Sequence, residues 1–225
     1  MSSLSTASYS IPGEYKYVLN FDLDETLFQA TKEEGEGGRT PKESPESNTA
    51  VLYGAKLWKP DPCNELSCRV SAIAGEKFKE LFGKIIKINR DAGETVIFVN
   101  IITNANYSEE GVVDVLKRFY GDDFIIHCYT NSVNRLTSKG GQMLQDYLES
   151  YWNQGIPPDH LYLIDDNESN CQDAQHCGFK AICASIRLES CVGGETRAQF
   201  NPEIFVELNK IIDSVREKVL ATHNQ

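Results

Sequence analysis

The sequence predicts an α/β protein, a three-layer sandwich in which helices cover both faces of a central parallel β-sheet. Two observations support this prediction. Strand-like and helix-like segments alternate along the chain and are joined without hairpin signals. The segment TVIFVNII at 95–102 is apolar on both faces, as a central parallel strand is. The 225 residues fit one generous domain, so we expect a single domain over residues 1–225.

Each expected element follows from its local pattern. The expected strands are short and rich in apolar side chains, and they cover Tyr15–Phe21, Thr95–Ile102, Phe124–Cys128, Leu161–Ile164 and Phe179–Ala184. The expected helices cover Glu76–Asn89, the run from an N-cap at Ser108 to Tyr120, Gly141–Trp152, Glu168–His176 and Ile204–Leu220.

An insertion follows the first strand directly, over residues 29–60. Ala30–Asn48 is charged, rich in Gly, Pro and Ser and almost free of apolar side chains, so it predicts a mobile loop. Ala50–Lys59 is typical of a small hairpin that turns at Gly54-Ala55. We therefore expect a flexible loop and a small flap after strand 1, too short for a large helical cap.

Composition limits the partners. The chain carries 22 Lys and Arg against 33 Asp and Glu, a net charge of −11, which disfavours nucleic acids and anionic membranes as partners. No apolar run approaches the roughly 18 residues of a membrane helix, and residues 1–17 do not resemble a secretion signal. The seven cysteines form no CxxC pair, so we expect reduced thiols and a soluble cytoplasmic protein.

Two pairs of acidic residues follow expected strands. Asp22 and Asp24 come directly after the first strand, and Asp165 and Asp166 come after LYLI. The carboxyl ends of parallel strands line the crevice in which such sheets bind ligands. Hard carboxylate oxygens at that edge suit Mg²⁺, which takes one or two protein carboxylates together with water and phosphate oxygens.

Three other polar residues occupy comparable positions. Thr103 and Asn104 follow the central strand, where a hydroxyl and free backbone N–H groups can hold phosphoryl oxygens, and Lys139 begins the next helix. Alone, each has an ordinary explanation as a turn or a solvated side chain. Together, and in this order, the polar strand ends indicate a site for a metal ion and a phosphate.

At this point the sequence resembles the haloacid dehalogenase (HAD)-like phosphohydrolase superfamily. LNFDLDETL resembles its first motif, IITNAN its second, TSKGG its third and LIDDNESNCQDAQHCGF its fourth with the elements that follow. The resemblance spans about Tyr15 to Ala184 and implies a HAD-like Rossmannoid fold. It also implies Mg²⁺ as the cofactor and an aspartyl-phosphate intermediate.

The resemblance implies a role for each motif residue. Asp22 is expected to be the nucleophile, and Asp24 the general acid and base, whose backbone carbonyl also binds the metal. Asp165 and Asp166 are expected to complete the metal shell, and which of them touches the ion stays open. The expected phosphate-binding residues are Thr103, Asn104 and Lys139. Because Asp24 can protonate an oxygen leaving group, the motif favours phosphate-ester hydrolysis over dehalogenation.

The small insertion bears on the substrate. An almost uncapped crevice favours a phosphorylated protein or peptide over a small phosphate ester. DLDETL is also close to the first motif of RNA polymerase carboxy-terminal-domain phosphatases. The arrangement resembles compact bacterial effectors that act as phosphotyrosine phosphatases in host cells, although no residue indicates such delivery. Tyr53 and Trp58 are expected either to stack on a phosphotyrosine ring or to pack against the sheet edge.

Three alternatives stay open at this stage. A phosphatase for small metabolites has the same motifs, and so does a phosphomutase or phosphotransferase. A phosphate-binding scaffold that has lost catalysis is the third, and it differs from an enzyme only in turnover.

Overall fold

The computed structural model describes residues 10–31, 49–52, 68–105, 107–131, 137–189 and 196–223. A five-stranded sheet with the order β6-β5-β1-β7-β8 forms its centre, and every neighbouring pair is parallel. The strands are β1 (Tyr17–Phe21), β5 (Ile97–Thr103), β6 (Cys128–Asn131), β7 (Leu161–Asp165) and β8 (Lys180–Cys183). The predicted central parallel sheet is confirmed, with β1 in the middle.

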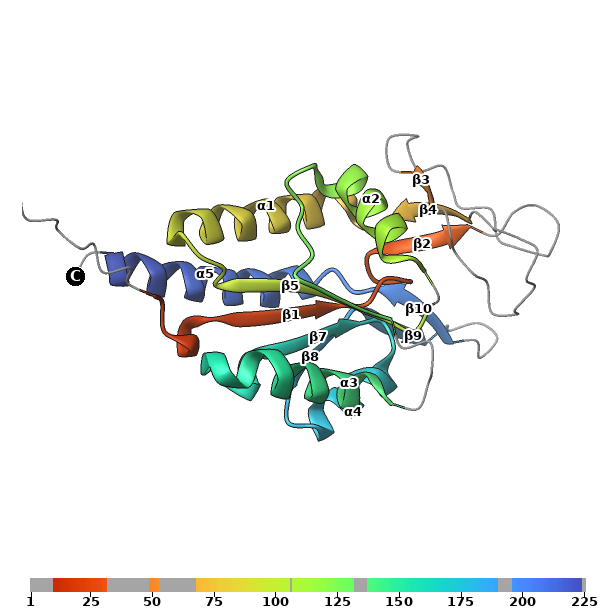
Figure 1. The fold of residues 1–225 in the computed structure, drawn as a ribbon. Helices are drawn as coiled ribbons and strands as arrows, with labels where there is room; N and C mark the ends of the chain where they lie inside the picture. The colour runs from red at the N-terminus through yellow and green to blue at the C-terminus, as the bar shows by residue number, and fades with distance from the viewer. Residues whose placement is uncertain are drawn as a thin grey trace, which may run out of the picture.

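Helices cover both faces of this sheet (Figure 1). One layer holds α1 (Gly75–Ala92), α2 (Glu109–Tyr120) and α5 (Ile204–His223), and the other holds α3 (Lys139–Asp146) and α4 (Glu168–His176). The three-layer architecture predicted from the alternating segments is therefore confirmed.

The alternation of side chains along β1 divides the core in two. Leu19 and Phe21 belong to the larger buried cluster, which lies under α1, α2 and α5. Val18 belongs to a second cluster, which contains Met143 and Tyr147 from the α3 layer. Successive side chains of a strand point to opposite faces, so a strand buried on both faces is apolar throughout.

A buried polar network interrupts this apolar pattern at the middle of the sheet. Asn20 and Asn100 are paired in register on β1 and β5, and the Asn100 side-chain amide donates to Asn20 Oδ1 at 3.0 Å. The same amide also donates to the Tyr151 hydroxyl at 2.9 Å, while the Asn20 amide donates to the Tyr162 carbonyl at 3.1 Å. These hydrogen bonds offset part of the cost of burying two amides, while Asn100 Oδ1 has no hydrogen-bond partner among the described residues.

The start of α3 differs from the sequence prediction of a helix over Gly141–Trp152. The helix begins at Lys139, because Ser138 Oγ accepts a hydrogen bond from the backbone N–H of Gly141 and caps the first turn. After Asp146 the chain continues as a π-helical segment, Tyr147–Tyr151, and a short 3₁₀ segment, Trp152–Gln154. The expected N-cap at Ser108 is confirmed, since its Oγ accepts from the N–H of Gly111.

The strand predicted at Phe124–Cys128 lies later in the chain, at Cys128–Asn131. Pairing with β5 begins only at the Asn100–Cys128 pair. Phe124 is buried, and its ring packs 4.7 Å from that of Phe82 on α1. Phe124 thus packs against a helix and lies before the paired strand.

The insertion after β1 forms a second, three-stranded antiparallel sheet, which we call the flap. Its order is β2-β4-β3, with β2 at Phe28–Thr31, β3 at Thr49–Leu52 and β4 at Cys68–Ala72. Within the described residues, β3 pairs with β4. Most of the hairpin expected over Ala50–Lys59 lies outside the described residues. The predicted turn at Gly54-Ala55 and most of the loop predicted over 30–48 lie outside the described residues.

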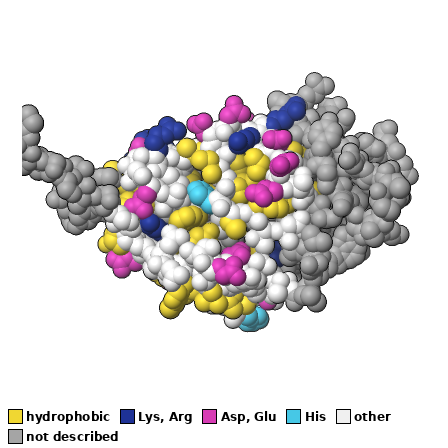
Figure 2. All heavy atoms as spheres, in the orientation of Figure 1, with side chains coloured by type: hydrophobic (Ala, Val, Ile, Leu, Met, Phe, Trp, Pro, Cys, Tyr) yellow, Lys and Arg dark blue, Asp and Glu magenta, His cyan; other side chains and the backbone are white. Residues whose placement is uncertain are grey.

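A hairpin that the sequence analysis did not predict precedes α5. It pairs β9 (Ser185–Glu189) with β10 (Thr196–Phe200) in antiparallel register. Figure 2 shows Lys and Arg side chains interspersed with Asp and Glu on the face that it displays, without a continuous basic stripe there. Within the described residues, no helix is both long and apolar enough to cross a membrane.

The network around Asn100 yields a stability prediction. Replacement Tyr151→Phe removes the acceptor of a buried amide N–H and should lower the free energy of unfolding by about 1–3 kcal/mol. Tyr147→Phe is the matched control, since the hydroxyl of this buried residue makes no hydrogen bond with the described part of the chain. Urea denaturation gives the free energy of unfolding of both variants. If both lose the same amount of stability, the hydrogen bond from Asn100 to Tyr151 does not contribute as predicted.

Candidate active site

The turn that follows β1 presents Asp22 at the carboxyl edge of the sheet. The backbone N–H of Asp22 donates to the Ile164 carbonyl on β7 at 2.9 Å, which continues the β1–β7 pairing by one residue. The chain then turns tightly, with the N–H groups of Leu27 and Phe28 both donating to the Leu23 carbonyl. Glu25 takes up a φ of 58°, a left-handed conformation that a non-glycine residue adopts at some cost. Asp22 itself is only 7% exposed.

Lys139 forms ion pairs with the acid that follows β1 and with the acid that ends β7. This residue opens α3 and is 3% exposed. Its Nζ lies 2.7 Å from Asp22 Oδ1 and 2.6 Å from Asp165 Oδ2. Burial by itself lowers the pKa of Lys139, but the charges of Asp22 and Asp165 outweigh it and raise that pKa above its usual value.

Asp165 is fully buried at the end of β7 and is held from several directions. Its Oδ1 accepts the backbone N–H of Asn167 at 2.8 Å, and the Asn170 side-chain amide lies 3.1 Å from each carboxylate oxygen. Asn170 lies on the first turns of α4, five residues after Asp165. These contacts fix the orientation of the Asp165 carboxylate.

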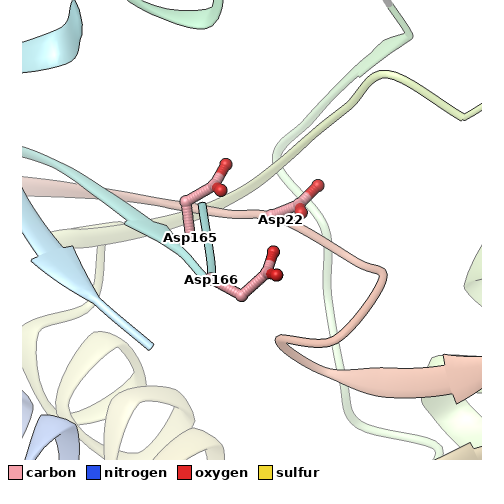
Figure 3. Close-up of side chains that lie close together, drawn as sticks. All are labelled: Asp22, Asp165 and Asp166. Carbon is pink, nitrogen blue, oxygen red and sulfur yellow. The ribbon is translucent and has the colours of Figure 1, made fainter. Parts of the chain in front are cut away.

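Three carboxylates converge at this edge, as Figure 3 shows for Asp22, Asp165 and Asp166. One ligand oxygen from each lies within 4.8 Å of the others. Asp166 is half-buried, and its backbone carbonyl accepts a hydrogen bond from the Ser185 hydroxyl. When ionised, these carboxylates and the Lys139 ammonium leave two negative charges in a poorly hydrated space, so the donor set fits a divalent cation with oxygen ligands such as Mg²⁺.

Burial changes the acid–base behaviour of this cluster. It is the main cause that raises the pKa of Asp22 to about 7, with the Asp165 charge acting in the same direction and Lys139 against it. It also raises the pKa of Asp166 to about 6, again with help from Asp165. Without a cation, Asp22 and Asp166 therefore ionise at a higher pH than ordinary carboxyl groups do.

Asp24 lies beside the cluster rather than in it. Its carboxylate is not among the three convergent ones, and its Oδ1 accepts a hydrogen bond from the Tyr107 hydroxyl at 2.7 Å. Burial raises the pKa of Asp24, and the hydrogen bond from Tyr107 lowers it by a smaller amount. A carboxyl group with a raised pKa is suited to giving up and taking back a proton.

The predicted phosphate-binding residues lie at the same edge of the sheet. Thr103 is buried at the end of β5, and its Oγ1 accepts the backbone N–H of Ala105 at 3.0 Å, while Asn104 is exposed. Tyr53 and Trp58 lie outside the described residues. The structure thus brings Asp22, Lys139, Asp165 and Asp166 into direct proximity.

Two further residues of the site, Asn170 and Tyr107, were not predicted from the sequence. Asn170 has a local signal, since a polar residue on the first turns of a helix lies close to the strand end before it. Tyr107 has no such signal. It reaches Asp24 from 83 residues away in the chain, which only the tertiary structure reveals.

Similarity to known proteins is found among solved structures. No family model and no curated protein sequence matches the chain. Among solved structures, the HAD domain of the effector protein Lem4 from Legionella pneumophila is similar at 16% identity, covering 90% of this chain and 98% of that one, with a TM-score of 0.46.

Two other solved structures are similar at lower TM-scores. Fcp1, an essential RNA polymerase II CTD phosphatase, shares 12% identity over 93% of this chain and 53% of its own, with a TM-score of 0.40. A HAD family enzyme from Bacteroides thetaiotaomicron, in complex with magnesium and inorganic phosphate, shares 14% identity over 75% of this chain and 93% of its own, with a TM-score of 0.32. Since all three TM-scores lie below 0.5, the activity of this chain has to follow from its own residues.

The contact between α3 and α4 leads to a prediction about the position of Lys139. A Cβ on Gly140 would lie 2.7 Å from the Asp173 carbonyl oxygen, so Gly140→Ala has to push α3 away from α4. We expect a loss of about 1–3 kcal/mol in the free energy of unfolding. Gly141→Ala is the control in the same turn, where the nearest atom is the movable Ser138 Oγ at 3.3 Å. If chemical denaturation gives both variants wild-type stability, the packing argument is wrong.

The carboxylate cluster leads to a prediction about Mg²⁺ and pH. Mg²⁺ added to the metal-free chain should increase the free energy of unfolding by about 1.4 kcal/mol for each tenfold excess of Mg²⁺ over its dissociation constant. The melting temperature should rise accordingly. Mg²⁺ competes with protons for Asp22 and Asp166, whose pKa values are raised to about 7 and about 6. The carboxylates lose these protons as the pH rises, so the Mg²⁺-induced shift should be larger at pH 8 than at pH 5.5.

Two variants make the Mg²⁺ measurement specific. Asp166→Asn should reduce the shift in melting temperature, whereas Asp114→Asn, which alters an exposed acid on α2, should leave it unchanged. An equal shift in both variants would mean that Mg²⁺ binds elsewhere.

Proposed function

We propose that this chain is a Mg²⁺-dependent phosphatase that hydrolyses phosphate monoesters through an aspartyl-phosphate on Asp22. The single observation that carries the proposal is the buried cluster in which Lys139 contacts both Asp22 and Asp165, with Asp166 completing the carboxylates. In-line phosphoryl transfer needs a positioned nucleophile and positive charge next to the phosphoryl group. Here a buried carboxylate would be the nucleophile, and an ammonium group and a divalent cation would supply the positive charge.

In the first step, a carboxylate oxygen of Asp22 attacks the phosphorus, and the bond between phosphorus and the ester oxygen breaks. Asp24 gives its proton to the departing oxygen, so the alcohol or phenol leaves neutral. Lys139 keeps Asp22 oriented and supplies fixed positive charge next to the transferred group. Thr103 and Asn104 lie at the same edge and are the proposed partners of the phosphoryl oxygens.

In the second step, Asp24 takes a proton from water as the water oxygen attacks the phosphorus. The bond to Asp22 then breaks and releases inorganic phosphate, which returns both acids to their starting states. Asp22, Asp165 and Asp166, with the Asp24 backbone carbonyl, are the residues proposed to hold Mg²⁺. When bound, the ion offsets the negative charge of the carboxylates and of the phosphoryl oxygens.

A phosphorylated protein or peptide is the proposed substrate class. In support, the described part of the insertion after β1 contributes only short strands to the flap. Between Thr103 and Lys139, the described chain forms only α2 and β6. Neither region contributes a helical cap within the described residues, and a site without such a cap admits a bulky substrate. A small phosphate ester is the alternative substrate on the same chemistry.

The test is a turnover assay on the full chain with Mg²⁺. We expect Asp22→Asn to lower kcat for an aryl phosphate by at least about 10³-fold, since it removes the group that forms the covalent intermediate. Asp114→Asn should keep wild-type activity. An Asp22→Asn variant with full activity, or a wild-type chain that binds phosphate without turnover, would refute the phosphatase proposal.

The substrate class needs a separate comparison. Phosphotyrosine and phosphoserine peptides are assayed beside sugar phosphates and nucleotides under the same conditions. Higher kcat/KM for peptides supports the phosphoprotein assignment, and faster turnover of small metabolites overturns it while leaving the phosphatase proposal intact.

A further inference from the structure

The hydrogen bond between Tyr107 and Asp24 has no place in the motifs, yet it touches the proposed general acid. The Tyr107 hydroxyl donates to Asp24 Oδ1 at 2.7 Å in a half-buried position. Hydrogen bonds to a carboxylate are stronger than those between neutral groups, and partial burial reduces the competition from water. This contact therefore restricts the rotation of the Asp24 carboxyl group.

Tyr107 is itself held from β6. Its backbone carbonyl accepts hydrogen bonds from the Tyr129 hydroxyl at 2.9 Å and from the Asn131 side-chain amide at 3.1 Å. Both donors lie on the strand that pairs with β5, so they tie the segment before α2 to the central sheet.

The ring of Tyr107 is held from the flap. It packs edge-to-face on Phe28, with centroids 5.8 Å apart, and Phe28 is fully buried at the start of β2. The backbone of Phe28 also forms an isolated β-bridge with Asp24, and its carbonyl accepts a hydrogen bond from the backbone N–H of Glu25 at 2.9 Å. The hydroxyl of Tyr107 and the carboxyl group of Asp24 are thus fixed relative to the same residue.

From this geometry we infer that Tyr107 is a positioning residue that directs the transferable proton of Asp24 to Oδ2. The Tyr107 hydroxyl donates to Oδ1. The carbonyl oxygen of a neutral carboxyl group accepts a hydrogen bond better than its hydroxyl oxygen does, so this contact favours the neutral form that carries its proton on Oδ2. Asp24 then delivers the proton from Oδ2 to the leaving oxygen and takes one from water at the same atom. Tyr107 keeps its own proton throughout, and its hydrogen bond stabilises the carboxylate formed between the two steps.

This inference rests on the proposed function, because it needs Asp24 to act as the general acid. The ring and the backbone of Tyr107 also support the loop structurally, so the test has to separate orientation of the proton from loss of packing. Tyr107→Phe is the suitable variant, since it keeps the ring against Phe28 and the backbone carbonyl that β6 holds.

The measurement is kcat/KM for a series of aryl phosphates with leaving groups of increasing basicity, on the full chain with Mg²⁺. This parameter includes steps only up to the first irreversible one, which is cleavage of the bond to the leaving group. General acid catalysis contributes most when the leaving group is a strong base. We expect Tyr107→Phe to lower kcat/KM by about 10–100-fold for phenyl phosphate and by less than about 3-fold for dinitrophenyl phosphate.

A matched control removes a different hydroxyl from the same region. The buried Tyr120 hydroxyl donates to the Leu27 carbonyl at 3.0 Å, in the turn that carries Asp24, but does not contact that acid. Tyr120→Phe should therefore change kcat/KM by the same factor for every leaving group. If Tyr107→Phe also gives a uniform change, or none, the positioning role is wrong.

Asp24→Asn separates failure of this inference from failure of the proposed function. If that variant loses activity most strongly with phenyl phosphate and Tyr107→Phe does not, Asp24 is the acid and only the role of Tyr107 is refuted. If Asp24→Asn has no dependence on the leaving group, the acid role of Asp24 fails, and the inference about Tyr107 fails with it. The double variant should show no greater dependence on the leaving group than Asp24→Asn alone.

Discussion

Lys139 lies between Asp22 and Asp165 with almost no exposure, and both carboxylates lie within 2.7 Å of its ammonium group. A buried charge is costly unless it is paired, and removing one partner leaves the others uncompensated. Here one cation faces three carboxylates that converge within 4.8 Å. The position of α3, the ends of β1 and β7 and the ionisation of the acids are all coupled through this contact.

The sheet supplies the frame in which this contact forms. β1 pairs with β5 on one side and β7 on the other, so the acids that follow β1 and β7 emerge side by side at the carboxyl edge. Gly140 allows the start of α3 to approach Asp173 on α4 closely, and the backbone N–H of Gly140 donates to the Asp173 carboxylate at 2.7 Å. Rigid elements thus hold the cluster, while desolvated acids and the left-handed Glu25 reduce stability at the same edge.

The site divides into two sides with different supports. Asp22, Lys139 and Asp165 depend on the central sheet and on the α3 layer. Asp24 depends on the turn after β1, on Phe28 of the flap and on Tyr107, which β6 anchors. Under the proposed function, changes in the flap therefore act most directly on Asp24, the group that handles the proton.

The sequence by itself determined the parallel sheet, both helical layers and the positions of the acidic pairs. Local apolar patterns encode strands and helices, and parallel strands necessarily bring their carboxyl ends to one edge. Only the tertiary structure decided that β3 pairs with β4, that Phe124 packs on α1, and that Tyr107 reaches Asp24. These contacts join segments that are distant in the chain, and no spacing along the sequence specifies which of them meet. The sequence therefore predicted which charged residues form the cluster, and the packing of the chain decided how its acids are held.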